Sequence, residues 1–171
     1  MLNLTINGRA VTVEEGKTIL EACRSAEIYV PTLCDDPELE PYGACRLCIV
    51  KVDGLRGLPS ACTTPAADGM QVTTENPEIL EVRHWTAQLL LADHPLDCLT
   101  CAQCGSCRLQ ELVEYLGVRE RLLPPMMRAA KIDDSNACYA IDMHKCILCG
   151  LCVRACAEVQ HLGAIDLVNR G

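Results

Sequence analysis

The cysteines of this chain fall into three dense groups, and this distribution constrains the fold more than any other feature of the sequence. The stretch from His94 to Cys107, HPLDCLTCAQCGSC, brings together one imidazole and four thiols. The other two groups are Cys34, Cys45, Cys48 and Cys62 before it, and Cys146, Cys149, Cys152 and Cys156 after it. Iron–sulfur clusters are the use of such soft ligands that explains all three groups together.

The rest of the composition favours small, metal-stabilised domains over one large core. The 171 residues include 14 cysteines, no phenylalanine and 3% aromatic residues, so large apolar side chains are scarce. The N-terminus lacks a signal-peptide pattern, and no apolar run reaches the roughly 20 residues that span a bilayer. We therefore expect a cytoplasmic protein without a transmembrane segment, whose cysteines bind metals instead of forming disulfides. The net charge of -8 argues against a nucleic-acid partner.

The N-terminal region has the pattern of a hairpin followed by a short helix. LNLTI and RAVTV alternate on either side of Asn7-Gly8, a strong turn signal, which predicts a hairpin over residues 2–13. Thr18 and Glu21 form a capping box at the head of TILEACRSA. Cys23 lies on the apolar face of that helix, so we interpret it as a small core residue and not as a ligand.

The first cysteine group continues this region. Gly43, in the loop GACRLC, permits the backbone angles that direct peptide N–H groups at sulfur. IVKVDG and MQVTT read as further strands, which completes the pattern of a small β-grasp domain. The group resembles the plant-type [2Fe–2S] signature, with the first interval widened to ten residues and the last one shortened. Tetrahedral zinc on the same four cysteines is the alternative.

Asn76-Pro77 predicts the start of a helix from about Glu78 to Leu91. Its apolar residues cover more than one stripe, so we expect it to be buried between modules. His94, Cys98, Cys101 and Cys107 follow, with Cys104 as an extra thiol that competes with Cys107 by spacing alone. LQELVEYL then predicts a helix ended by Gly117, and residues 118–136 are a candidate linker.

The segment HPLDCLTC...GSCRLQ, including Asp97 and Leu109-Gln110, resembles a known [4Fe–4S] motif of one histidine and three cysteines. That motif occurs in the large iron–sulfur subunit of respiratory complex I, in [FeFe]-hydrogenases, in diaphorase subunits of NAD-reducing hydrogenases and in NAD-linked formate dehydrogenases. The resemblance implies that His94, Cys98, Cys101 and Cys107 bind one [4Fe–4S] cluster. Cys104 is then surplus.

The last group lies between the strand-like YAIDM and a predicted helix, VRACAEVQ, with AIDLV as an expected closing strand. This is half of a bacterial-type ferredoxin fold, in which the fourth cysteine of the run ligates a second cluster. The fourth ligand beside Cys146, Cys149 and Cys152 is therefore open between Cys156, Cys138 and a partner residue. Of these possibilities and that of a longer natural chain, we favour a chain that continues past Gly171 and carries the second C-x2-C-x2-C run there. KCILCGLCVRACAEVQ most resembles the formate dehydrogenase and hydrogenase members.

Together these patterns predict an α+β chain of three domains. They are a β-grasp [2Fe–2S] ferredoxin domain over 1–76, a small helical [4Fe–4S] domain with one histidine and three cysteine ligands over 77–130, and a partial bacterial-type [4Fe–4S] ferredoxin domain over 131–171. One [2Fe–2S] and two [4Fe–4S] clusters would relay electrons, and no residue is predicted to act on a substrate.

By resemblance, the partners are a flavin subunit that exchanges electrons with NAD(P) and a catalytic unit that oxidises formate or dihydrogen. The alternatives are a complex I type iron–sulfur subunit, a structural zinc protein that mediates interactions, and a free-standing ferredoxin.

Overall fold

The computed structural model describes residues 1–126 and 132–168. Within it the chain forms two compact units, Met1–Leu80 with Cys149–Gly171, and Glu81–Leu148. The three-domain division made from the sequence stays a prediction. No helix in the described ranges is long and apolar enough to cross a membrane.

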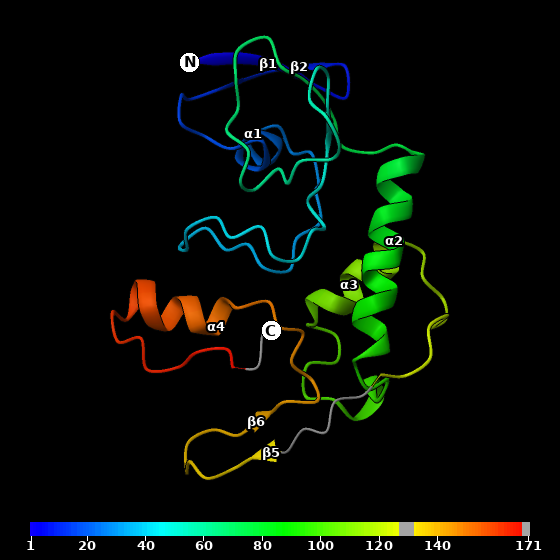
Figure 1. Ribbon diagram of the computed structural model, residues 1–171, viewed down its shortest axis with the longest axis vertical. Helices are drawn as coiled ribbons and strands as arrows, with labels where there is room; N and C mark the ends of the chain where they lie inside the picture. The colour runs from blue at the N-terminus through cyan, green and yellow to red at the C-terminus, as the bar shows by residue number, and fades with distance from the viewer. Residues whose placement is uncertain (127–131, 169–171) are drawn as a thin grey trace. The chain divides into compact units, whose positions relative to one another are not determined.

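The first unit is built on a four-stranded sheet with the order β2-β1-β4-β3, of which Figure 1 labels β1 and β2. Its strands are β1 (Leu2–Ile6), β2 (Arg9–Val13), β3 (Lys51–Val52) and β4 (Gln71–Thr73). β1 and β2 form the predicted hairpin, and Asn7 and Gly8 both take the positive φ that its tight turn requires. β4 runs parallel to β1 and antiparallel to β3. The segment between α1 and β3 contains Cys34, Cys45 and Cys48, and the segment between β3 and β4 contains Cys62.

Helix α1 (Ile19–Ser25) begins at the predicted capping box. Glu21 N donates to Thr18 Oγ1 at 3.2 Å, and Thr18 N donates to Glu21 Oε2 at 2.8 Å. The helix buries its apolar face among the strand residues that form the core. Cys23 is fully buried in that core, as expected of a small apolar residue.

The C-terminal part of the first unit contains α4 (Leu151–Arg154), which continues as a π-helical turn over Ala155–Val159. The predicted helix over VRACAEVQ is thus present. The predicted closing strand is wrong, because residues 164–168 form no strand. Ile165 and Val168 are exposed, so neither a paired backbone nor a buried face stabilises an extended strand there.

The second unit contains most of α2 (Pro77–Ala92), whose predicted cap is present because Ile79 N donates to Asn76 Oδ1 at 2.8 Å. The expectation that this helix is buried between modules stays a prediction, and in the described residues one stripe of it is buried. Ile79, Ala87, Leu91 and Ala92 are buried, whereas Leu80, Val82, Trp85 and Leu89 are exposed. The apolar residues outside the buried stripe therefore face solvent in this chain.

Helix α3 (Arg108–Tyr115) lies beside α2 in Figure 1, and Arg83 Nη1 of α2 donates to Tyr115 Oη of α3 at 3.4 Å. Gln88, also buried on α2, bonds the chain that follows α3: Nε2 donates to Glu120 O at 3.1 Å, and Oε1 accepts from Leu122 N at 2.8 Å. The predicted linker over 118–136 is therefore partly structured. The side-chain amide of Gln88 satisfies the backbone groups that would face water in a free linker.

The same predicted linker ends inside a second sheet. Two short strands, β5 (Ile132–Asp133) and β6 (Ile141–Asp142), pair antiparallel. Residues 127–131 of the predicted linker lie outside the described residues. The strand expected in YAIDM is present as β6, and its neighbour β5 was not anticipated.

Candidate metal centres

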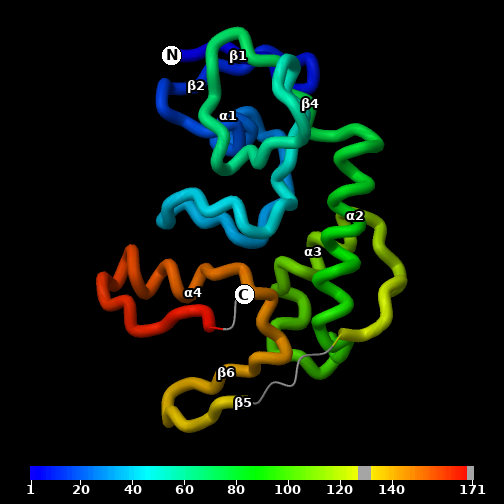
Figure 2. The backbone as a smooth tube through the Cα atoms, viewed as in Figure 1, coloured from blue at the N-terminus to red at the C-terminus, as the bar shows by residue number. Residues whose placement is uncertain are grey.

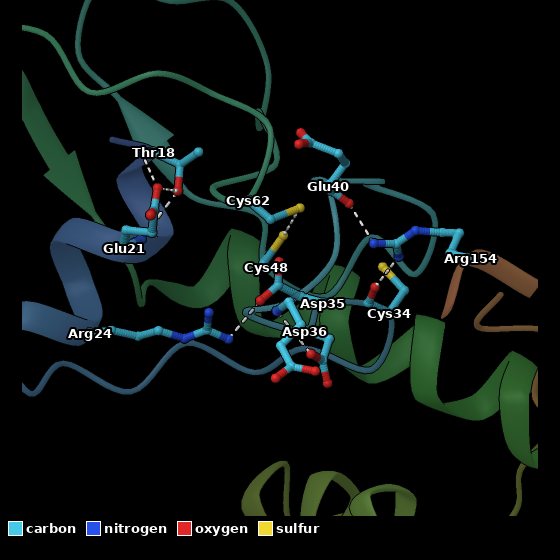
Figure 3. A network of polar contacts seen from close by, with 11 residues as sticks. Thr18, Glu21, Arg24, Cys34, Asp35, Asp36, Glu40, Cys48, Cys62 and Arg154 are labelled. Atoms are coloured by element: carbon cyan, nitrogen blue, oxygen red, sulfur yellow. Dashed lines mark hydrogen bonds and ion pairs between the residues drawn. The ribbon is translucent and has the colours of Figure 1, made fainter. Parts of the chain in front are cut away.

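The first cysteine group lies on the crossover between α1 and β3 and on the turn that follows β3, and Figure 3 shows Cys34, Cys48 and Cys62. An isolated bridge joins Ile49 to Ser60, and Ala61 N donates to Cys48 O at 2.9 Å. This short pairing sets Cys48 opposite Ala61 and so brings Cys48 close to Cys62, the next residue. Cys34, Cys48 and Cys62 are almost completely buried, while Cys45 is partly accessible.

The four thiols form two pairs. The sulfur atoms of Cys48 and Cys62 are 3.3 Å apart. A hydrogen bond from the thiol of Cys34 raises its own pKa and lowers the pKa of Cys45 to about 5. The bond between the second pair likewise lowers the pKa of Cys48 and raises that of Cys62. Two sulfur pairs fit a [2Fe–2S] cluster, because each of its two irons takes two protein thiolates.

Backbone donors also point at these sulfurs, as the glycine of the loop predicted. Gly43 has a φ of +68°, and Cys45 N donates to Cys34 Sγ at 3.3 Å. Arg46 takes a positive φ between Cys45 and Cys48, and its Nη1 donates to Ser60 Oγ at 2.6 Å. A non-glycine residue in this conformation is strained, and such strain is typical of functional loops.

The second group surrounds a short 3-10 turn, Cys98–Thr100, and the start of α3. Cys107 is the N-cap of α3 and is partly buried, whereas Cys104 is exposed. Lys145 Nζ lies 3.2 Å from Asp97 Oδ2, which ties this turn to the segment that precedes the third group.

The ring of His94 has one nitrogen engaged. Its Nδ1 lies 2.7 Å from Pro95 O. A carbonyl oxygen only accepts hydrogen bonds, so this contact assigns the proton to Nδ1 and leaves the lone pair on Nε2. A metal-binding histidine is commonly oriented by such a hydrogen bond from the ring nitrogen that does not bind the metal. His94 therefore fits the predicted role of an iron ligand.

His94 also lines a cavity of the second unit together with Cys146. The other lining residues are Thr86, Leu89, Leu90, Asp93, Ile147 and Leu148. The structure thus brings together a residue of the second predicted group and the first cysteine of the third group.

The third group starts in the second unit with Cys146 and continues in the first unit with Cys149, Cys152 and Cys156. Leu148, between Cys146 and Cys149, has a φ of +56°, so this C-x2-C loop also contains a non-glycine residue in the left-handed region, one position later than Arg46 in the first loop. Cys156 Sγ accepts a bond from Ala164 N at 3.3 Å. Cys138, one of the candidate fourth ligands, is exposed beyond β5.

In the described ranges, no three His, Cys, Asp or Glu side chains converge closely enough to bind a single metal ion. The individual ligand assignments stay predictions.

Sequence reasoning missed one charged residue at the first site. Arg154 is buried, and its Nη1 donates to Cys34 O at 2.8 Å across 120 positions of the chain. The sequence offered a weak signal, a cation between Cys152 and Cys156, but no local pattern pairs it with Cys34.

Comparison with known families covers three segments of the chain. Residues 1–77 match the family described as a 2Fe-2S iron-sulfur cluster binding domain. Residues 83–121 match the NADH-ubiquinone oxidoreductase-G iron-sulfur binding region, and residues 139–156 match a 4Fe-4S binding domain. These segments contain the three cysteine groups in the predicted order.

Curated relatives extend over the whole chain. It is 41% identical to the NADP-reducing hydrogenase subunit HndD of Solidesulfovibrio fructosivorans, covering 100% of this chain and 30% of the relative. It is 33% identical to the NADH-ubiquinone oxidoreductase 75 kDa subunit of Reclinomonas americana, covering 100% of this chain and 25% of that protein. The chain therefore spans less than a third of the length of these relatives.

A solved structure shares the fold. The crystal structure of NAD+-reducing [NiFe]-hydrogenase in the H2-reduced state contains a chain that matches with a TM-score of 0.93 and 33% identity. The match covers 99% of this chain and 71% of that one.

Fold and cysteine groups together define an iron–sulfur protein with [2Fe–2S] and [4Fe–4S] binding domains. The chain belongs to the family of iron–sulfur proteins that includes both hydrogenase subunits and the large iron–sulfur subunit of complex I. The predicted family and α+β fold are confirmed.

Proposed function

We propose that the chain relays single electrons through three clusters. A [2Fe–2S] cluster would be held by Cys34, Cys45, Cys48 and Cys62, and one [4Fe–4S] cluster by His94, Cys98, Cys101 and Cys107. A second [4Fe–4S] cluster would be held by Cys146, Cys149 and Cys152, with Cys156 as the candidate fourth ligand. The observation that carries this proposal is the pairing of the four sulfurs in the first group within a domain of the matching family.

The clusters would supply the redox chemistry, and the chain's own groups would set position and potential. Burial of Cys34, Cys48 and Cys62 keeps water away from the first site, and the N–H of Cys45 stabilises negative charge on sulfur. The Nδ1 bond of His94 orients its ring for ligation through Nε2.

The partners belong to this proposal. The names of the relatives describe a subunit of an NADP-reducing hydrogenase, a subunit of an NADH-ubiquinone oxidoreductase and the alpha subunit of an NADPH-Fe(3+) oxidoreductase from Geobacter sulfurreducens. We infer that the chain accepts or delivers electrons at a flavin subunit that uses NAD(P). The other end of the relay would be a catalytic unit of the hydrogenase type; a formate-oxidising unit is the second candidate.

Metal and sulfide analysis of anaerobically purified protein tests the proposal. We expect about ten irons and a similar amount of acid-labile sulfide per chain, with the visible absorption of iron–sulfur clusters. Zinc in place of iron and sulfide would contradict the relay. NADH or NADPH should reduce the clusters only when the flavin subunit is present, because nothing in the proposed relay accepts hydride.

A further inference from the structure

Arg154 comes from the third cysteine group but makes its contacts at the first. It lies on α4 between Cys152 and Cys156. Its Nη1 donates to Cys34 O at 2.8 Å, and its Nη2 donates to Glu40 O. Figure 3 shows the guanidinium directed at the loop that follows Cys34, and Figure 2 shows that loop approaching α4.

Two neighbours complete this arrangement. The guanidinium carbon lies 5.1 Å from the ring centre of Tyr42, a cation–π distance. Glu158 pairs with Arg154 through Nε at 3.4 Å, and its other oxygen accepts from Glu40 N at 2.8 Å. Arg154 and Glu158 thus hold both backbone groups of Glu40.

We propose that Arg154 is a positioning residue of the [2Fe–2S] site, which fixes the loop between Cys34 and Cys45 and raises the reduction potential of the cluster. The proposal rests on the assignment of the [2Fe–2S] cluster to Cys34, Cys45, Cys48 and Cys62. It adds a residue from outside the matched [2Fe–2S] domain, which ends at residue 77.

Burial of the charges gives the sign of the effect. The side chain of Arg154 is 9% exposed, whereas that of its partner Glu158 is 31% exposed. Water therefore screens the carboxylate more than the guanidinium, and a net positive field remains at Cys34.

On the other side of Cys34, Asp35 pairs with Arg24 at 2.7 Å, with side chains 10% and 43% exposed. In this pair water screens the negative charge of Asp35 less than the positive charge of Arg24. Arg154 therefore opposes the field of Asp35, and its removal leaves that field unbalanced. A reduced cluster carries one more negative charge than an oxidised one, so loss of the cation disfavours reduction.

The experiment compares Arg154→Gln and Arg154→Lys in the full chain, with the [2Fe–2S] midpoint potential measured by EPR-monitored redox titration. We expect the Gln variant to lower the equilibrium constant for reduction about tenfold, equivalent to about 59 mV for one electron. The Lys variant keeps the charge and should recover part of this shift. Asp35→Asn should shift the potential in the opposite direction.

Arg9→Gln is the matched control. Arg9 Nη1 also donates to a backbone carbonyl of the first unit, Ala26 O at 2.9 Å, at the end of α1 and not on the cysteine loop. The [2Fe–2S] midpoint potential of the Arg9→Gln variant should equal that of the unchanged protein. A role of Arg154 in stability alone would change unfolding of the Gln variant and leave the potential unaltered.

An unchanged [2Fe–2S] potential in Arg154→Gln, with the cluster present, overturns the proposal. So does a shift confined to a [4Fe–4S] centre. If the Gln variant fails to incorporate the [2Fe–2S] cluster, the Lys variant decides: a restored cluster near the original potential supports the proposal, and an equal failure refutes it. Absence of a [2Fe–2S] signal in the unchanged protein would instead refute the cluster assignment.

Discussion

At the scale of single residues, His94 is the predicted ligand that distinguishes the second group from an all-cysteine site. Its Nδ1 is engaged by Pro95 O, so Nε2 is the nitrogen that we assign to iron. A neutral imidazole in place of a thiolate makes a cluster less negative by one charge, which raises its potential.

Replacement of His94 by Cys should therefore keep a [4Fe–4S] cluster and lower its potential, because a thiolate adds negative charge. Redox titration followed by EPR measures the change, and His94→Ala is the companion variant. If the EPR spectra and potentials of all centres stay unchanged in His94→Ala, this ring does not bind iron.

The choice between Cys104 and Cys107 is a second question at this scale. Cys107 caps α3 and is partly buried, whereas Cys104 lies exposed in the preceding turn. We expect Cys104→Ser to keep all iron, because Cys104 is not among the assigned ligands. Cys107→Ser should lose one [4Fe–4S] cluster by iron analysis and EPR. The reverse result would exchange the two roles.

At the scale of elements, the loop that carries Cys45 depends on Gly43. A Cβ at this position would lie 3.0 Å from Thr63 Cγ2, and the φ of +68° disfavours any side chain. Gly43→Ala should therefore lower the free energy of unfolding of the [2Fe–2S] site by more than the roughly 1–2 kcal/mol of backbone strain alone. Loss of cluster absorbance on heating is the measurement.

Gly57→Ala is the control for that prediction. Gly57 has a φ of +78°, but nothing lies within 4 Å of its added Cβ. It should show the backbone strain without the steric contact. Equal loss of stability in the two variants would mean that the packing of Gly43 against Thr63 is unimportant.

The capping box of α1 gives a further prediction for an element. Thr18→Ala removes the acceptor for Glu21 N, which should lower the free energy of unfolding by about 1 kcal/mol. Urea unfolding followed by the [2Fe–2S] absorbance measures it. Thr12→Ala removes an exposed bond to Asn3 Oδ1 and should change stability by less than about 0.5 kcal/mol. An effect of Thr12→Ala as large as that of Thr18→Ala would contradict the capping argument.

These elements show why some of the fold could be predicted and some could not. The Asn7-Gly8 turn, the Thr18–Glu21 box and the Asn76 cap depend on neighbouring residues, so the sequence contains their complete signal. Strand formation over 164–168 depends on a partner backbone, and the alternation of AIDLV does not supply one.

The candidate sites also contain features that the sequence predicts and features that it does not. The spacing of Cys34, Cys45, Cys48 and Cys62 predicted a common site, and this assignment stays a prediction; the structure places Cys45 beside Cys34 and Cys48 beside Cys62. The contact of Arg154 with Cys34 O joins residues 120 positions apart and has no local signal. The charged residues near a cluster can be identified only from the three-dimensional structure, because in the sequence every distant Lys or Arg is an equal candidate.

At the scale of the whole molecule, the chain combines the three binding segments of a family that includes hydrogenase and complex I subunits. It spans 30% of the hydrogenase relative and 25% of the NADH-ubiquinone oxidoreductase relative. Iron–sulfur cluster binding is common to these segments. The substrate at each end of the proposed relay would depend on the partners and not on residues of this chain.

The most direct test of this account is a redox titration of the purified chain with EPR spin quantification. We predict three centres per chain that accept one electron each: one with the spectrum of a [2Fe–2S] cluster and two with spectra of [4Fe–4S] clusters. Serine in place of Cys48 should remove the [2Fe–2S] signal and leave the other two in place. A chain that contains zinc and gives no signal on reduction, or a [2Fe–2S] signal that survives in Cys48→Ser, would contradict the account.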